Sequence, residues 1–147
     1  MKLSLTKQNQ KVWPVLYNGR DGITSTMQSY HHGIFDQHFF SKYSKGDTLV
    51  IIGKLGETDF VTAFVAEYIS PVTDTLVEGT KVWGHAPSKL QTSNGSPTHH
   101  NMQVLTTPLP FRMKLNGVQG GTIRNAERSK LYARIEKEWK KEWSNKS

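Results

Sequence analysis

The chain has 147 residues and a mass of 16.7 kDa, the size of one domain, and its 35% apolar residues suffice for one small core. Its 19 Lys and Arg residues against 12 Asp and Glu give a formal charge of +7, which favours a polyanionic partner. The lack of cysteine excludes disulfides, thiolate nucleophiles and cysteine-ligated zinc, and no apolar run is long enough for a membrane span. We therefore expect a single cytoplasmic domain over residues 1–147, without a signal peptide.

The first predicted elements are a strand and a short helix. Residues 11–17 (Lys-Val-Trp-Pro-Val-Leu-Tyr) predict the first strand, and Pro14 places it at a sheet edge or a bulge. Phe35, Phe39 and Tyr43 then recur every four positions. This spacing predicts an amphipathic helix over residues 33–43.

The middle of the chain predicts a β-hairpin. Residues 48–52 form a short apolar run after the turn at residues 45–47, and turn-forming residues follow at 53–59. Residues 60–69 are apolar on both alternating faces, which is typical of a central strand. The hairpin is expected to end at Ser70-Pro71.

The second half predicts more strands and then a long helix. Further strands are expected at residues 80–83, 102–107 and 111–115, with an exposed loop at 88–101. A C-terminal helix is expected at residues 125–143, with Asn125 as its N-cap. Its apolar residues recur every four positions and predict a helix docked on the domain: Leu131, Ile135, Trp139 and Trp143. Clustered strands with helices towards the ends indicate an α+β domain or a small barrel.

The histidines give a weak indication of chemistry. His31-His32 and His99-His100 are sequence neighbours, and neighbours on a strand point to opposite faces, so neither pair is suited to chelate one metal. No His-Glu-x-x-His motif is present, and we expect no metal and no cofactor. An imidazole titrates near neutral pH, so His31 or His32 is a candidate general base, with Asp36 nearby.

Residues 116–125 form a glycine-rich segment before the last helix. Backbone N–H groups at such a position can hold a phosphate, although the same glycines also suit a tight turn. The segment lacks the Gly-Lys-Ser/Thr ending of a nucleotide-binding P-loop. It therefore gives no support for ATP or GTP hydrolysis.

Aromatic residues at strand ends and in loops point to nucleic acid. They are Trp13, Tyr17, Tyr30 and Trp83, interleaved with Arg20, Lys81, His85 and Arg112. Aromatic faces stack on bases while cations hold the phosphate backbone. The same aromatics also suit core packing, but together with the basic charge they favour binding.

Several short motifs resemble one known family. They are Gly33-Ile34, residues 45–47, 48–52 and 60–69, Ser70-Pro71, the strand bounded by Pro108 and Leu115, Gly120-Gly121, and Leu131-Tyr132. In this order they resemble the EVE branch of the PUA-like superfamily, which includes readers of modified bases. The resemblance implies a small PUA-like β-barrel of about five to six mostly antiparallel strands, a short helix after the first strand and a C-terminal amphipathic helix. Where EVE domains often have Gly-Val/Ile-Arg-Asn, this chain has Gly33-Ile34-Phe35-Asp36.

The sequence therefore predicts a non-enzymatic domain that binds DNA or RNA and no membrane, and that reads a modified or flipped base. The predicted contact residues are Trp13, Tyr17 and Trp83 for stacking, Asn18 and Asp36 for base edges, and Arg20 and Arg124 for phosphates, together with His32. Two alternatives stay open. One is a phosphodiester- or nucleotide-directed enzyme that uses His31 or His32, and the other is a basic module that binds an acidic protein partner through its tail helix.

Overall fold

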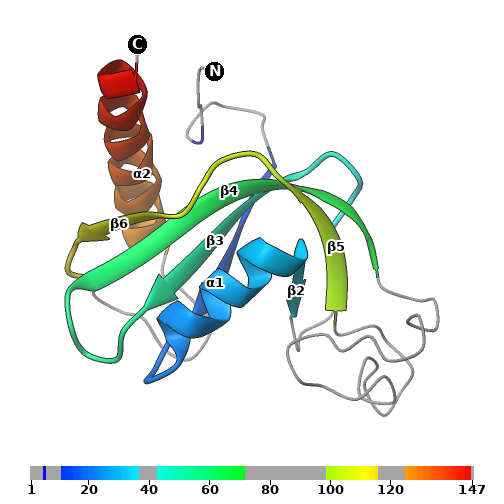
Figure 1. The fold of residues 1–147 in the computed structure, drawn as a ribbon, viewed down its shortest axis with the longest axis horizontal. Helices are drawn as coiled ribbons and strands as arrows, with labels where there is room; N and C mark the ends of the chain where they lie inside the picture. The colour runs from blue at the N-terminus through cyan, green and yellow to red at the C-terminus, as the bar shows by residue number, and fades with distance from the viewer. Residues whose placement is uncertain (1–4, 6–10, 37–42, 72–98, 116–124, 147) are drawn as a thin grey trace.

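The computed structural model describes residues 5, 11–36, 43–71, 99–115 and 125–146 (Figure 1). Its elements, in chain order, are β1 (Val12–Tyr17), α1 (Gly22–His32), β2 (Ile34–Asp36), β3 (Thr48–Lys54), β4 (Phe60–Pro71), β5 (His99–Val104), β6 (Leu109–Arg112) and α2 (Asn125–Lys146). Over these described residues the protein is therefore α+β, with one mixed sheet and two helices. Within the described residues, neither α1 nor α2 is long and apolar enough to cross a membrane.

The strands form one sheet in the order β1-β3-β4-β5-β2. β1 pairs in parallel with β3, and every other pairing is antiparallel. The long strand β4 pairs with β3 on one side, and on its other side first with β6 and then with β5. Among the described strands the sheet is not closed into a barrel, and β1 and β2 are its two edges.

The predicted first strand and the central hairpin are confirmed. β3 and β4 pair in register from Thr48 opposite Glu67 to Lys54 opposite Val61. β1 lies at an edge, as Pro14 predicts. Thr48 donates its N–H to the carbonyl of Lys11 at 3.1 Å. By alternation, the backbone nitrogen of Pro14 points away from β3, so its missing N–H costs no hydrogen bond between the strands.

The helix predicted over residues 33–43 is wrong where the structure describes it. Gly33 instead ends α1 in the left-handed conformation (φ 66°), with its N–H donated to the carbonyl of Ser29 at 2.9 Å, and Ile34–Asp36 form β2. Residues 37–42 lie outside the described residues. The missed helix α1 buries the small residues Gly22, Thr26 and Ser29, while its apolar residues Ile23, Met27 and Tyr30 are only half-buried.

The remaining strand predictions are confirmed with shifted boundaries. The strands expected at 102–107 and 111–115 correspond to β5 and β6, each of which begins two or three residues earlier. The predicted loop is wrong at residues 99–101, which belong to β5. The expected strand at 80–83 and the rest of that loop lie outside the described residues.

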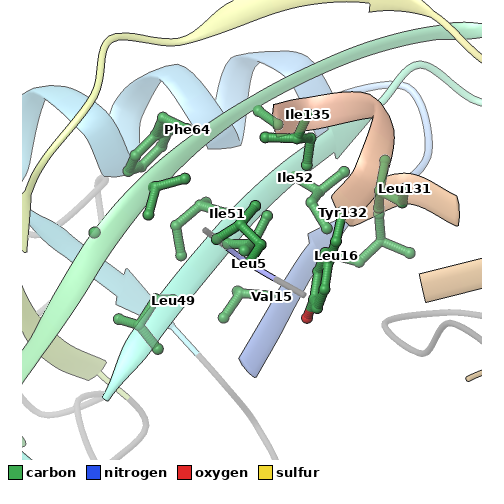
Figure 2. Packing of buried hydrophobic residues seen from close by; sticks show 14 of the residues in the cluster. Leu5, Val15, Leu16, Leu49, Ile51, Ile52, Phe64, Leu131, Tyr132 and Ile135 are labelled. Carbon is green, nitrogen blue, oxygen red and sulfur yellow. The ribbon is translucent and has the colours of Figure 1, made fainter. Parts of the chain in front are cut away.

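Helix α2 packs its apolar face on the sheet, as predicted. Leu131 and Ile135 are fully buried, and Tyr132 and Trp139 are nearly so. Figure 2 shows Leu131, Tyr132 and Ile135 beside Ile52 and Leu16. Phe64 lies on the α1 side of the sheet. The two helices therefore cover opposite faces. The side chains of Trp143 and Asn125 lie outside the described set.

Tyr132 carries a buried hydroxyl that bonds to no described residue. Burial raises the pKa of Tyr132 well above its ordinary value, while the nearby Arg128 acts in the opposite direction. Since this polar group has no hydrogen-bond partner among the described residues, we expect Tyr132→Phe to leave the free energy of unfolding unchanged or raise it by about 1 kcal/mol. Urea denaturation measures the change.

Tyr68→Phe is the matched control for this prediction. The hydroxyl of Tyr68 is hydrogen-bonded to Nδ1 of His100 at 2.9 Å, in a buried position. Its removal is therefore expected to cost about 1–3 kcal/mol. An equal loss in Tyr132→Phe would show that the hydroxyl of Tyr132 has a stabilising partner.

Candidate nucleic-acid interface

Five rings gather where the two edges of the sheet approach each other; we call them the aromatic seam. They are Trp13, Phe35, Tyr43, Tyr68 and His100. Tyr43 contacts Trp13 on β1 with ring centroids 5.7 Å apart, and Phe35 on β2 at 5.4 Å. A single side chain thus bridges both edge strands, which requires a strongly curled sheet.

The floor of the aromatic seam is buried. Phe35 stacks on His100 at 5.1 Å, and Tyr43 stacks on Tyr68 at 5.2 Å. Phe35, Tyr68 and His100 are almost completely inaccessible to solvent, whereas Trp13 and Tyr43 are half-buried. Trp13 and Tyr43 thus keep part of their surface exposed, and the buried rings hold Tyr43, which in turn packs against Trp13.

A hydrogen bond from its indole orients Trp13, and two exposed lysines belong to the same region of the chain. Its indole N–H donates to Oδ2 of Asp47 at 2.8 Å, and the same oxygen accepts the backbone N–H of Ser44 at 2.9 Å. The indole is thereby oriented by the turn before β3. Lys11 lies two residues before Trp13 and Lys45 lies in that turn, and both are exposed. The half-buried rings are therefore accompanied by solvated positive charge.

The other predicted residues of β1 and its following turn lie elsewhere. Tyr17 accepts a hydrogen bond from Oγ of Ser29 at 3.2 Å, so its hydroxyl contributes to docking α1. Asn18 and Arg20 are exposed in the turn between β1 and α1, where Oδ1 of Asn18 accepts the N–H of Gly19. That turn is about 16 Å along the strand from Trp13. The structure thus brings Asn18 and Arg20 together, but not with Trp13.

The histidine candidates lie at the other end of α1. His31 and His32 are exposed in its last turn, and Figure 1 shows α1 ending beside β2. His32 is three residues from Phe35 and so belongs to the seam end of the sheet. Asp36 ends β2, but its side chain is outside the described set, as are Trp83 and Arg124. Among the described side chains, no three His, Asp or Glu are placed to hold a metal ion.

Sequence reasoning missed four of the five rings in the seam. Phe35 and Tyr43 were assigned to a helix, Tyr68 to the face of a core strand, and His100 to a loop. One signal for His100 was present, because His100, Met102 and Val104 alternate with the polar Asn101 and Gln103. The cluster itself depends on contacts between residues far apart in sequence.

Comparison with known proteins finds no match. No family model, no curated protein and no solved structure matches this chain. Its function therefore has to be inferred from its own residues.

Proposed function

We propose that this domain binds nucleic acid, DNA or RNA, and stacks a base on the outer rings of the aromatic seam. The observation that carries the proposal is the pair of half-buried rings, Trp13 and Tyr43, beside exposed lysines, with Tyr43 packed on a buried aromatic floor. A base that stacks on such a ring gains about 1–3 kcal/mol, and cations beside it hold the backbone.

The orientation of Trp13 supports this proposal. Asp47 holds the indole edge at 2.8 Å, and Tyr43 packs edge-to-face against the ring. A ring that is already ordered loses little conformational freedom when a base stacks on it, so more of the contact energy appears as affinity. The +7 charge of the chain adds attraction to phosphates at longer range.

We extend the proposal to the fold and to the ligand. In this proposal the curled sheet, whose two edge strands both contact Tyr43, corresponds to the PUA-like barrel. The ligand is a modified or flipped base. The confirmed hairpin, the first strand followed by a helix, and α2 support the resemblance. In contrast to the motif order on which the resemblance was based, the helix precedes Gly33 rather than following it.

Replacement of Trp13 tests the stacking site. Trp13→Ala is expected to weaken binding by about 1–3 kcal/mol, which is roughly 5- to 150-fold in Kd. The matched control is Val12→Ala, since Val12 is next to Trp13 on β1 but points to the opposite face, and it should keep the affinity of the wild type. Fluorescence anisotropy with labelled single-stranded and duplex DNA and RNA, with and without modified bases, measures Kd, and the thermal midpoint confirms folding.

Two results would contradict the proposal. A wild-type protein that binds none of these nucleic acids at low salt would refute the nucleic-acid function altogether. A folded Trp13→Ala protein with unchanged affinity would remove the aromatic seam from the binding site. A preference for one modified base that is lost in Trp13→Ala would support the reader function.

A further inference from the structure

Four cationic side chains line one side of α2; we call them the basic ridge. They are Lys130, Arg134, Lys137 and Lys141, spaced by four, three and four residues. Because an α-helix has 3.6 residues per turn, this spacing places them in one line, about 16 Å long. Successive cations are therefore about 4.5–6 Å apart along the helix axis.

The packing of α2 fixes the direction in which the basic ridge points. Leu131 and Ile135 are fully buried against the sheet, which sets the rotation of the helix about its axis. Lys130 and Lys141 at the two ends of the ridge have side chains 66% and 62% exposed. Lys137 is exposed as well, whereas Arg134 is half-buried, so the three lysines of the ridge are the cations that face solvent.

Two carboxylates partly neutralise the basic ridge. Lys130 pairs with Glu127 at 3.6 Å, while Arg134 at 2.8 Å and Lys141 at 3.9 Å share Glu138. Lys137 pairs with no carboxylate that the structure describes. Both carboxylates lie between the ridge and the buried face, so they do not cover the outer side of the lysines. The ridge keeps a net charge of about +2.

The members of the basic ridge differ in how readily they can change partners. Arg134 also lies over the ring of Phe111, 5.3 Å from its centroid, so two contacts hold it in place. The pairs of Lys130 and Lys141 are long, and their lysines are exposed although Glu127 and Glu138 are largely buried. An incoming phosphate can therefore engage Lys137 without displacing a described carboxylate, and can approach Lys130 and Lys141 from their exposed sides.

We propose that the basic ridge binds the phosphate backbone of a nucleic acid, as a second contact surface of the function proposed above, on which this inference rests. A straight row of flexible point charges fits a chain of phosphates, each of which it contacts without reading a base. An acidic protein fits less well, because protein interfaces need apolar or aromatic anchors. Among the described residues, the exposed large apolar side chains are Leu55, Ile69 and Leu105, and none of them is on α2.

Lys137→Gln tests the ridge, with Lys140→Gln as its matched control. Both lysines are exposed on the same helix and both changes remove one charge, but Lys140 points away from the line of the ridge. Gln and Lys have similar helix propensities, so neither change should alter folding. The probes are a labelled oligo(dT) and a labelled DNA duplex, each titrated at several salt concentrations.

We expect Lys137→Gln to weaken binding about three- to fivefold for both probes, and to reduce the slope of log K against log salt by about 0.7–0.9. Lys140→Gln should keep the slope of the wild type. Equal slopes in the two variants would contradict the proposal that the basic ridge binds phosphates, and would not affect the proposal for the aromatic seam. A wild-type protein that binds neither probe would refute the proposed function itself, and binding of poly-glutamate that depends on Lys137 would assign the ridge to an acidic protein instead.

Discussion

Gly22→Ala is expected to lower the free energy of unfolding by about 3 kcal/mol or more. A Cβ atom on Gly22 would lie 2.3 Å from the carbonyl oxygen of Lys54 and 2.6 Å from that of Tyr17. Both obstacles are backbone atoms of the sheet, so no side-chain rotation relieves the contact. Helix α1 would have to move away from β1 and β3.

The helix and the sheet approach each other equally closely one helical turn later, at Thr26. A Cβ on Gly53 of β3 would lie 2.3 Å from Oγ1 of Thr26 and 2.8 Å from the carbonyl of Gly22. The two glycines thus allow helix and strand to meet backbone to backbone. The turn before α1 depends on the same geometry, because the carbonyl of Gly19 accepts N–H groups from Gly22 and from Gly56.

Thermal and urea unfolding measure the effect of Gly22→Ala, and Gly56→Ala is its control. Gly56 has open space around a built Cβ but a φ of 54°, so alanine there should cost only about 1 kcal/mol of backbone strain. Gly22→Ala should lower the thermal midpoint by about 10 °C, well beyond the control. Equal losses in the two variants would mean that α1 is not held at the distance the structure shows.

The strands that sequence reasoning located best carry dense apolar residues. Residues 48–52 and 60–69 bury most of their side chains in β3 and β4, so their patterns were unambiguous. Pro14 was equally informative, because a residue without an N–H fits only positions that face away from a neighbouring strand. No local pattern indicated the parallel pairing of β1 with β3, because that pairing depends on the path of the chain between the two strands.

Helix α1 was missed, and a helix over residues 33–43 was wrongly predicted, for two different reasons. The buried residues of α1 are glycine, threonine and serine, and its aromatic contact, Tyr30 on Phe64 at 5.5 Å, comes from a half-buried position. Phe35 and Tyr43 did show a helical spacing and do touch, with ring centroids 5.4 Å apart. The contact, however, joins a residue of β2 to one in the segment before β3. A period in sequence thus indicated a true contact but the wrong element.

The candidate site was predictable only in part, for a similar reason. The sequence indicates Trp13 because it falls near a strand end, among aromatic residues interleaved with cations. Its partners Asp47 and Tyr43 come from a turn some thirty residues later in the chain. In the basic ridge, by contrast, every residue belongs to one helix, so the spacing of the lysines was visible in the sequence and only the direction in which they face required the structure.

A chain that ends at Arg124 and so lacks α2 is expected not to fold. α2 contributes Leu131, Tyr132, Ile135 and Trp139 to the core. Burial of each such side chain contributes about 1.5–3 kcal/mol, so their joint loss approaches the roughly 5–15 kcal/mol that holds a whole domain together. The truncated chain should therefore show no cooperative thermal transition by circular dichroism.

Two point variants separate the packing of α2 from its charge. Ile135→Ala removes a fully buried side chain and should cost about 2–5 kcal/mol, whereas Lys137→Ala on the exposed side should stay within about 0.5 kcal/mol. If the truncated chain instead melts cooperatively and Ile135→Ala behaves like Lys137→Ala, α2 is an appendage whose partner lies outside this domain. The burial of Ile135 argues against that outcome, because the sheet face beneath it carries Ile52 and Leu16, which need an apolar cover. α2 therefore has two functions in our account: its apolar face completes the core, and its opposite side presents the lysines to the phosphate backbone.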